Sequence, residues 1–268
     1  CYIINVKIII KLRYKKPLIL VTNDDGITAP GIRSLIEVMS EIGEVVVVAP
    51  DSPQSAMGHA ITINSTLHCT KINVPNAKHL EYSCSGTPAD CVKLAVNEIL
   101  DRKPDLCVSG INHGSNSSIN VIYSGTMSAA LEAGIEGIQA IGFSLLDYLW
   151  GADFEAIKNY VKKITLSALQ NKIPANVVLN VNFPKLKEEQ INGIKICRQA
   201  KAYWVEEFDK RRNPMGLDYY WLTGKFVNED KGEDTDEWAL ANGYISVVPV
   251  EFDLTAHHAF QHLNTWDF

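Results

Sequence analysis

The stretch Pro17-Leu-Ile-Leu-Val-Thr-Asn-Asp-Asp-Gly26 decides the fold class of this chain. Its apolar part, Leu18–Thr22, is typical of a strand that is buried on both faces of a parallel sheet. The strand then ends on Asn23 and on two adjacent carboxylates, Asp24 and Asp25, which repel each other unless a positive charge offsets them. The glycine that follows lets the chain turn away without crowding a ligand. The stretch therefore predicts a buried strand with a polar site at its end.

Strands and helices alternate outward from this stretch. An apolar stripe at helical spacing follows Pro30 and stops at Gly43, and Glu44–Pro50 is a second buried strand. Thr87 marks a strong helix start, because Thr caps a first turn and the Pro after it suits the first helical position. The other predicted elements are strands at 104–109, 138–143 and 177–181 and helices at 126–133 and 154–169. This alternation predicts a three-layer α/β fold with a mostly parallel sheet.

Two regions depart from the alternation. Residues 60–67 alternate like a half-buried strand, in a loop excursion or in a hairpin with Leu80–Cys84. Further along, residues 194–198 and 219–226 have the pattern of antiparallel strands, with a charged stretch between them. An acidic loop, a short helix and a strand at 244–250 follow. These segments predict a β-rich appendage and a C-terminal arm that wraps the core or a neighbouring subunit.

The change of pattern divides the chain into three expected parts. We expect an N-terminal extension at residues 1–16, an α/β core at 17–190, and a β-hairpin appendage with an oligomerisation arm, packed on the core, at 191–268. The extension places its apolar segment before its basic one, which is the wrong order for a signal peptide. It is also too short to span a bilayer.

Composition narrows the function classes. A net charge of −6 and a pI near 5.7, without a long block of like charge, argue against a dedicated duplex-DNA binder and a membrane-surface protein. A small anionic substrate stays compatible with this charge, because local donors and a metal can bind it. The six cysteines are scattered and form no CxxC pair. This usage favours free thiols in a reducing cytoplasm over disulfides or a zinc site.

Four polar segments fall where predicted strands end, at residues 23–26, 51–55, 110–116 and 123–126. In a doubly wound parallel sheet these ends form the usual ligand crevice. Asp24 and Asp25 supply hard oxygen ligands, and a hydroxyl from Ser55 and an amide oxygen from Asn112 would complete a shell that Mg²⁺ or Mn²⁺ prefers. The alternative is that the Asp-Gly pair only forms a turn and caps a helix. Convergence of the four segments favours the metal site.

Two of these segments suit an anion. The loop from Gly110 to Asn116 is rich in small and amide side chains, so its backbone N–H groups can approach a phosphate closely. Ser124, Gly125 and Thr126 open a helix, whose free N–H groups and dipole make a second anion site. The alternative is that both segments are ordinary loops, since Gly, Ser and Asn are common loop residues.

Other polar and aromatic residues have less specific interpretations. His59 and His113 lie near the predicted crevice and are candidate acids or bases, although isolated histidines more often serve packing or surface roles. We assign structural roles to His257 and His258 in the arm, to Asp234 and Asp236 as caps of the helix around Trp238, and to Trp204, Tyr219, Tyr220 and Trp221 as a packed hairpin rather than a base-stacking platform.

Six runs of sequence carry a resemblance to a known family. They are ILVTNDDGITAPGI, VVVVAPDSPQS, CSGTPADCVKLA, DLCVSGINHGSN, YSGTMSAALEA and GYISVVPV, in one order from about Pro17 to Thr255. Together they resemble the SurE (stationary-phase survival protein E) nucleotidases. The resemblance implies a Rossmann-like α/β core and a phosphatase of nucleoside 5′- and 3′-monophosphates that depends on one divalent cation, Mg²⁺ or Mn²⁺, per subunit. It also implies a homodimer or homotetramer built partly by exchanged C-terminal segments.

Position by position, the resemblance implies a set of site residues. The metal ligands fall on Asp24, Asp25, Ser55 and Asn112, and the phosphate side falls on Asn23, Gly110, Asn116, Ser124, Gly125 and Thr126. This sequence departs from the pattern of the family at two places. The loop at residues 52–56 lacks the arginines and the Ser-Gly pair common in relatives, and Met127 stands where Val is usual.

Metal-assisted hydrolysis of a phosphomonoester is the hypothesis that these residues favour. Asp24 and Asp25 would anchor the cation, and one of them would also steer the attacking water or transfer a proton. The expected partner is a small nucleotide, without dedicated nucleic-acid or membrane binding. One alternative is an aspartyl-phosphate phosphatase of the haloacid dehalogenase type, although Asn23 occupies the place of its nucleophilic acid. Another is a nucleotide-binding sensor without turnover.

Overall fold

The computed structural model describes residues 16–268, so residues 1–15 of the expected extension lie outside the described part. The strands of the main sheet are β1 (Leu18–Thr22), β2 (Glu44–Pro50), β3 (Cys69–Ile72), β4 (Leu80–Cys84), β5 (Leu106–His113), β6 (Ala140–Leu145), β7 (Val177–Phe183), β8 (Gly193–Ile196) and β11 (Tyr244–Glu251). The helices are α2 (Pro30–Ile42), α3 (Pro88–Leu94), α4 (Asn120–Tyr123), α5 (Gly125–Ile135), α6 (Lys158–Asn171), α7 (Asp236–Ala241) and α8 (Phe260–Leu263), with short turns at Ala95–Ile99, Glu155–Ile157, Glu188–Gln190 and His257–Ala259. Two further strands, β9 (Ala202–Arg212) and β10 (Asp218–Asn228), form a separate hairpin.

The main sheet has the strand order β3-β4-β2-β1-β5-β6-β7-β11-β8. Its neighbouring strands are parallel except in the pairs β3/β4 and β7/β11, which are antiparallel. The mostly parallel sheet predicted from the alternation of strands and helices is therefore confirmed. The strands β1 and β2 have the predicted bounds, and β5 extends further than predicted, to His113.

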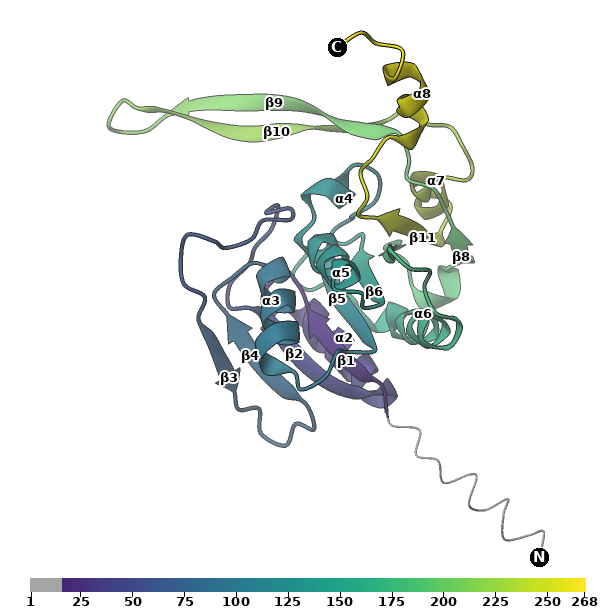
Figure 1. Ribbon diagram of the computed structural model, residues 1–268. Helices are drawn as coiled ribbons and strands as arrows, with labels where there is room; N and C mark the ends of the chain where they lie inside the picture. The colour runs from purple at the N-terminus through teal and green to yellow at the C-terminus, as the bar shows by residue number, and fades with distance from the viewer. Residues whose placement is uncertain (1–15) are drawn as a thin grey trace, which may run out of the picture.

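Helices cover both faces of this sheet and make the three layers (Figure 1). Ile19 of β1 packs in one cluster with side chains of α2 and α6, and Leu20 packs in another with side chains of α3 and α5. Successive residues of β1 thus face opposite layers, which explains why the strand is apolar without alternation. Fully burying a side chain such as Leu20 stabilises the fold by about 1.5–3 kcal/mol.

The expected strand at residues 60–67 is wrong, because this segment has no regular secondary structure. The partner of β4 is instead β3, with Cys69 opposite Cys84. Thr62 shows why the expected strand does not form. Its backbone N–H and its hydroxyl both donate to the Asp90 carboxylate in the first turn of α3, at 2.9 and 2.6 Å, so they are not paired with a strand.

Two strands that were expected in the appendage belong to the main sheet. Strand β8, which overlaps the expected strand at 194–198, is parallel to β11 and does not pair with residues 219–226. Strand β11 is antiparallel to β7, and its Ile245 and Val247 are buried in the cluster that contains α2 and α6. The hairpin partner of β10 is β9, whose last residues lie in the stretch expected to be a charged connection.

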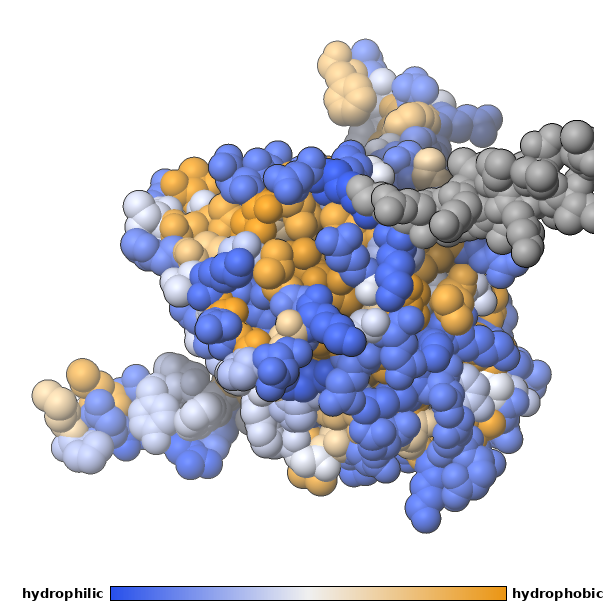
Figure 2. All heavy atoms as spheres, turned by 90° about the horizontal axis from the view of Figure 1, so that it is seen from below, coloured by the Kyte–Doolittle hydropathy of each residue, from blue (hydrophilic) through white to orange (hydrophobic). Residues whose placement is uncertain are grey.

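The β9–β10 hairpin projects away from the body (Figure 1). Seen from below, it extends beyond the lower left of the body and carries hydrophobic side chains on its surface (Figure 2). The expected packed hairpin is wrong for its aromatic residues, because Trp204, Tyr219, Tyr220 and Trp221 are 41–59% exposed. A two-stranded ribbon has no second layer against which to bury them.

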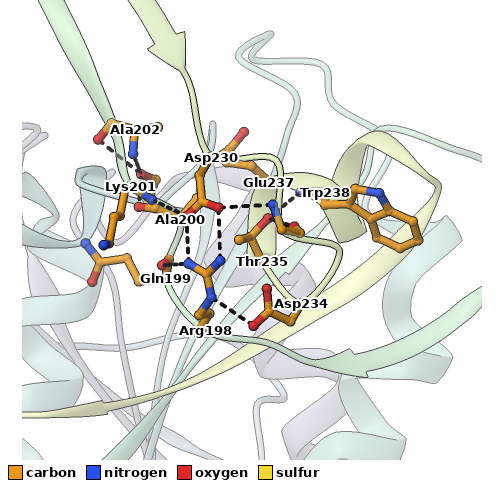
Figure 3. Close-up of polar contacts among 12 residues, drawn as sticks. Arg198, Gln199, Ala200, Lys201, Ala202, Asp230, Asp234, Thr235, Glu237 and Trp238 are labelled. Carbon is orange, nitrogen blue, oxygen red and sulfur yellow. Dashed lines mark hydrogen bonds and ion pairs between the residues drawn. The ribbon is translucent and has the colours of Figure 1, made fainter.

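The root of the hairpin is fixed by a charged clamp (Figure 3). The Arg198 guanidinium, just before β9, contacts both carboxylate oxygens of Asp230 at 2.6 and 2.9 Å and one oxygen of Asp234 at 2.8 Å. The Lys201 backbone N–H also donates to Asp230, at 3.1 Å. The forked geometry of Arg makes this bidentate contact directional, so it sets how the two ends of the hairpin enter the body.

Helix caps were predicted correctly at one helix and wrongly at another. Thr87 and Asp90 form a reciprocal capping box at the start of α3, with bonds of 3.1 and 2.9 Å. At α7 the cap is Thr235, whose hydroxyl accepts the N–H of Trp238 at 3.2 Å, and not Asp234 or Asp236.

The five cysteines in the described part are free thiols. None of the helices in this part is long and apolar enough to cross a membrane.

Candidate active site

The carboxyl ends of β1, β2 and β5 meet at one edge of the sheet, and a pocket of about 250 Å³ opens there. The residues that line it are Asp24, Asp25, Ser55, Ala56, Asn112, His113, Gly114, Ser115, Asn116, Asn120, Tyr123, Ser124, Tyr148 and Trp204. All four predicted metal ligands are among them, together with Asn116 and Ser124 of the predicted phosphate site. The other predicted residues do not line the pocket, although each lies one or two positions from a residue that does: Asn23, Gly110, Gly125 and Thr126.

Asp24 lies at the floor of the pocket with 4% of its surface exposed. Its Oδ1 accepts a hydrogen bond of 2.5 Å from the Thr126 hydroxyl. Gly125 approaches it so closely that a Cβ at this position would lie 2.7 Å from the Asp24 Cβ. The start of α5 therefore holds Asp24 from behind, which explains why a glycine and a hydroxyl residue stand there. Burial, and then the neighbouring charge of Asp25, raises the pKa of Asp24 to about 6.

Asp25 is held from the other side by His113. The Asp25 Oδ2 lies 3.0 Å from the His113 Nδ1 and accepts the His113 backbone N–H at 3.2 Å. The imidazole stacks on Trp150 with 5.5 Å between ring centroids and meets the edge of Phe154 at 5.0 Å. These contacts fix the ring, so His113 orients the Asp25 carboxylate. Of the two candidate histidines, only His113 lines the pocket, because His59 pairs with Glu132 elsewhere, at 2.9 Å.

The donor set of the pocket fits a hard divalent cation. Within residues 16–268, neither Asp24 nor Asp25 forms an ion pair with a Lys or Arg side chain, and the ion-pair partner of Asp25 is His113. Asn112 donates its Nδ2 to the Gly114 carbonyl at 2.9 Å, which leaves its Oδ1 as a possible ligand. Ser55 adds a hydroxyl. A set made of oxygen donors suits Mg²⁺ or Mn²⁺ better than zinc.

Asn116 sits at the centre of a buried amide network. Its backbone N–H donates to the Asn182 Oδ1 at 2.8 Å, and its Nδ2 donates to the Ser144 hydroxyl at 2.8 Å. Its carbonyl oxygen accepts the Asn180 Nδ2 at 2.7 Å, and Asn180 accepts in turn from Asn182 at 2.9 Å. These bonds tie the loop after β5 to β6 and β7. The loop therefore has one fixed conformation beside the two aspartates.

Gly110 and Asn23 shape the backbone around the pocket. Gly110 has a φ of +124°, and a Cβ at this position would lie only 2.3 Å from the Phe143 carbonyl oxygen of β6. Such a position requires glycine. Asn23 donates its Nδ2 to the Gly26 carbonyl at 2.9 Å, which closes the turn after β1. Its buried Oδ1 has no hydrogen-bond partner within the described residues.

The start of α5 borders the pocket at Ser124. The Ser124 hydroxyl accepts the Met127 N–H at 3.0 Å and so acts as the N-cap. The N–H groups of the first turn of a helix have no intrahelical partners, and they lie at the positive end of the helix dipole. The anion site at Ser124, Gly125 and Thr126 stays a prediction, and Ser124 is the one of the three that lines the pocket.

The pocket has an aromatic rim, of which the sequence placed only Tyr123, in the segment 123–126, at the crevice. Tyr123, Tyr148 and Trp204 line the outer wall and are 51%, 73% and 41% exposed. Tyr123 directly precedes the Ser124 cap, so its sequence position carried a signal. Tyr148 and Trp204 come from a loop after β6 and from the hairpin, and no local pattern connects either of them to the pocket.

Comparison with known proteins gives consistent matches over the α/β core. The family model described as survival protein SurE matches residues 19–206. The 5′-nucleotidase SurE of Flavobacterium psychrophilum is 80% identical over 252 residues, which cover 94% of this chain and 98% of that protein. The 5′-nucleotidase SurE of Bacteroides fragilis is 48% identical over 94% of this chain and 98% of that protein.

The fold has a solved counterpart as well. The crystal structure of the SurE protein from Aquifex aeolicus superposes with a TM-score of 0.81 at 40% identity, and covers 92% of this chain and 98% of that chain. Every residue that lines the pocket, from Asp24 to Trp204, lies within the range 19–206 that matches the family.

Proposed function

This chain belongs to the SurE family, and we propose that the pocket around Asp24 and Asp25 is where it hydrolyses nucleoside 5′-monophosphates to nucleoside and phosphate. It is a hydrolase that acts on nucleoside monophosphates, because relatives up to 80% identical over nearly the whole chain are 5′-nucleotidases. One observation carries the assignment of the site. Four oxygen donors from three separate segments, Asp24 with Asp25, Ser55 and Asn112, line one pocket at the carboxyl edge of the sheet.

These four residues would hold one divalent cation per subunit, Mg²⁺ or Mn²⁺. When bound, such a cation neutralises phosphoryl charge and lowers the pKa of a water molecule. The chain's own groups supply the rest. N–H groups at the start of α5 and in the loop after β5 would bind the phosphoryl oxygens as charge is redistributed. Asp25 suits the orientation of the attacking water, because His113 fixes its carboxylate while a hydroxyl engages Asp24.

The aromatic rim suits the nucleoside half of the substrate. A phosphate at the acidic floor would place the base near Tyr123, Tyr148 and Trp204, and every base offers a π face on which aromatic side chains can stack. Stacking tolerates different bases, so this wall favours a nucleotidase that accepts several of them. We extend the proposal to 3′-monophosphates, because the residues at the floor of the pocket would act on the phosphoryl group, which both esters share.

Membership of the SurE family argues against the two alternative functions. In the dehalogenase-type mechanism an aspartate two residues before the second acid attacks phosphorus. Here that position is Asn23, whose amide is tied to the Gly26 carbonyl at 2.9 Å. A sensor without turnover is opposed by the activity of the relatives.

The assembly and location are part of the same proposal. We propose a homodimer or homotetramer in the cytoplasm. Hydrophobic side chains on the hairpin, such as Phe208 and Leu217, and on the C-terminal segment, such as Leu254 and Trp266, are 53–93% exposed in the single chain. Surfaces of this kind mark protein contacts. Size-exclusion chromatography with light scattering would test it, and a monomer at all concentrations would refute it.

The proposed function is tested by a phosphate-release assay. AMP and 3′-AMP are incubated with the enzyme and Mg²⁺, Mn²⁺, Ca²⁺ or EDTA, and inorganic phosphate is measured. We expect release from AMP that depends on Mg²⁺ or Mn²⁺ and disappears with EDTA. Absence of release from every nucleotide with every metal would overturn the proposal.

A further inference from the structure

A chain of hydrogen bonds runs from helix α7 into the pocket. The Ser117 hydroxyl donates to the Glu237 carboxylate, and the Ser117 Oγ lies 2.5 Å from the Ser115 Oγ. Ser115 lines the pocket. Glu237 lies 120 positions beyond Ser117 in the sequence, so the contact connects the C-terminal part of the fold with the loop after β5.

The loop that carries this chain is held firmly. The Asp236 carboxylate, next to Glu237, accepts the Ser118 N–H at 2.7 Å and the Ala200 N–H at 2.9 Å. The Ser118 hydroxyl donates to the Ala200 carbonyl at 2.9 Å. Residues on both sides of the Ser117 contact are therefore fixed. The position of the Ser115 hydroxyl is set by the fold and not by free rotation of the loop.

The donors and acceptors available fix the direction of each hydrogen bond between Glu237, Ser117 and Ser115. An ionised carboxylate only accepts, so the Ser117 O–H is committed to Glu237. The Ser117 oxygen then accepts the Ser115 O–H. The Ser115 oxygen also accepts the Ser117 backbone N–H at 3.1 Å. One lone pair of Ser115 is left, so this side chain offers the pocket an acceptor and no donor.

The position of Ser115 in the pocket limits which group can donate a hydrogen bond to it. Its backbone N–H lies 3.5 Å from the Tyr148 hydroxyl, and a Cβ at the neighbouring Gly114 would lie 2.3 Å from the Tyr148 ring. Ser115 is thus beneath the aromatic rim, on the way from the acidic floor. A phosphate oxygen without a proton cannot donate a hydrogen bond, but a sugar hydroxyl can.

We propose that Ser115 accepts a hydrogen bond from a sugar hydroxyl of the nucleotide, and that Glu237 is the positioning residue that sets this polarity through Ser117. The inference rests on the proposed function, because it concerns the sugar of the same substrate. Its consequence is a preference for nucleotides that carry this hydroxyl. A site whose polar group is left unpaired discriminates against the analogue that lacks the hydroxyl.

The test compares kcat/KM for AMP, 2′-deoxy-AMP and 3′-deoxy-AMP. Burial raises the pKa of Glu237, so the assays are run at pH 8 to favour the ionised carboxylate. We expect the wild type to prefer AMP over one of the two deoxy substrates by about tenfold. Ser115→Ala and Glu237→Met should remove this preference by lowering kcat/KM for AMP, while the disfavoured deoxy substrate is hydrolysed as before.

Three further variants distinguish positioning from a structural role. Glu237→Gln keeps an acceptor oxygen for Ser117 and should retain the preference. Glu233→Met changes an exposed glutamate outside the chain of hydrogen bonds and should behave as wild type. In the double variant of Ser115→Ala and Glu237→Met, the loss should not exceed that of Ser115→Ala alone, because both act on one contact.

Three results would overturn the inference. The first is a wild type that does not discriminate between AMP and either deoxy substrate. The second is a Glu237→Met variant that loses activity equally on all three substrates. The third is additive loss in the double variant. Failure of the proposed function itself looks different, because then no nucleotide releases phosphate with any metal.

Discussion

The indole Nε1 of Trp204 donates a hydrogen bond to the Asn120 Oδ1 across 2.8 Å. Trp204 belongs to β9 and Asn120 opens α4, so the contact ties the hairpin to the rim of the pocket. The indole also meets Phe226 of β10 edge to face, with 5.4 Å between ring centroids. A ring that is held at two edges and still partly exposed is suited to stack on a nucleobase.

Replacing Trp204 by Ala should therefore weaken nucleotide binding. We expect the KM for AMP to rise about tenfold with little change in kcat, because base stacking contributes about 1–3 kcal/mol. Ribose 5-phosphate has no base and should be hydrolysed by both proteins alike. Trp204→Phe keeps a π face and should lose less, and Trp221→Ala, on the hairpin but outside the pocket, is the control. An equal loss on ribose 5-phosphate would contradict base stacking.

Replacing Asp24 by Asn should abolish metal-dependent phosphate release without unfolding the protein. The Asn side chain can still accept the Thr126 hydroxyl, while the charge that would hold the cation is removed. Because burial and the repulsion from Asp25 disfavour the carboxylate, the variant should melt at the same or a higher temperature in the absence of metal. Activity and melting temperature are measured together, with Asp101→Asn as an exposed control. A folded Asp24→Asn variant with full activity would refute the assignment.

Replacing His113 by Leu should disturb Asp25. Loss of a side chain that orients a metal ligand costs about 10- to 100-fold in metal affinity or activity. His113→Asn keeps a donor near the position of Nδ1 and should retain more activity. The measurement is phosphate release as a function of Mn²⁺ concentration, with His68→Asn, an exposed histidine outside the pocket, as the control. If His113→Leu needs no more Mn²⁺ than wild type and keeps its rate, His113 does not orient the ligand.

Local features of the sequence predicted the floor of the site. The buried strand β1 follows from its apolar run, and the rule that parallel strands present their carboxyl ends at one edge brings Asp24, Asp25, Ser55 and Asn112 together. Both steps use short-range patterns or a general property of the fold. The predicted ligands therefore line one pocket although they come from three segments.

The rim and the outer strands depend on contacts that a local pattern does not encode. Strand β11 was predicted as a strand, but its place beside β7 depends on tertiary pairing. Trp204 reaches the pocket because Arg198 and Asp236 fix the root of the hairpin. The link between Glu237 and the pocket could not be predicted for the same reason, since its hydrogen-bond partner Ser117 is far away in sequence.

Glu81 should make the stability of the fold depend on acidic pH. Its side chain is 2% exposed and contacts the Arg33 guanidinium at 2.8 and 3.0 Å and the His79 imidazole at 2.6 Å. Burial acts to raise the pKa of Glu81, but these hydrogen bonds outweigh it and hold the pKa below its ordinary value of 4.5. A carboxylate with a lowered pKa in the folded state stabilises the protein above the unfolded value, and this contribution is lost as the pH falls through the folded value.

Glu81→Gln should therefore lower the free energy of unfolding at pH 7 by about 2 kcal/mol, as expected for hydrogen bonds to a charged group. The difference from wild type should stay constant down to about pH 5 and shrink as the pH falls below 4.5, where the wild-type carboxylate begins to be protonated in the unfolded state. Urea denaturation at pH 7, 5 and 3.5 measures it. Glu44→Gln, at an exposed position at the start of β2, controls for the loss of one charge. A destabilisation of the same size at every pH would show that Glu81 stabilises the fold by packing and not by its charge.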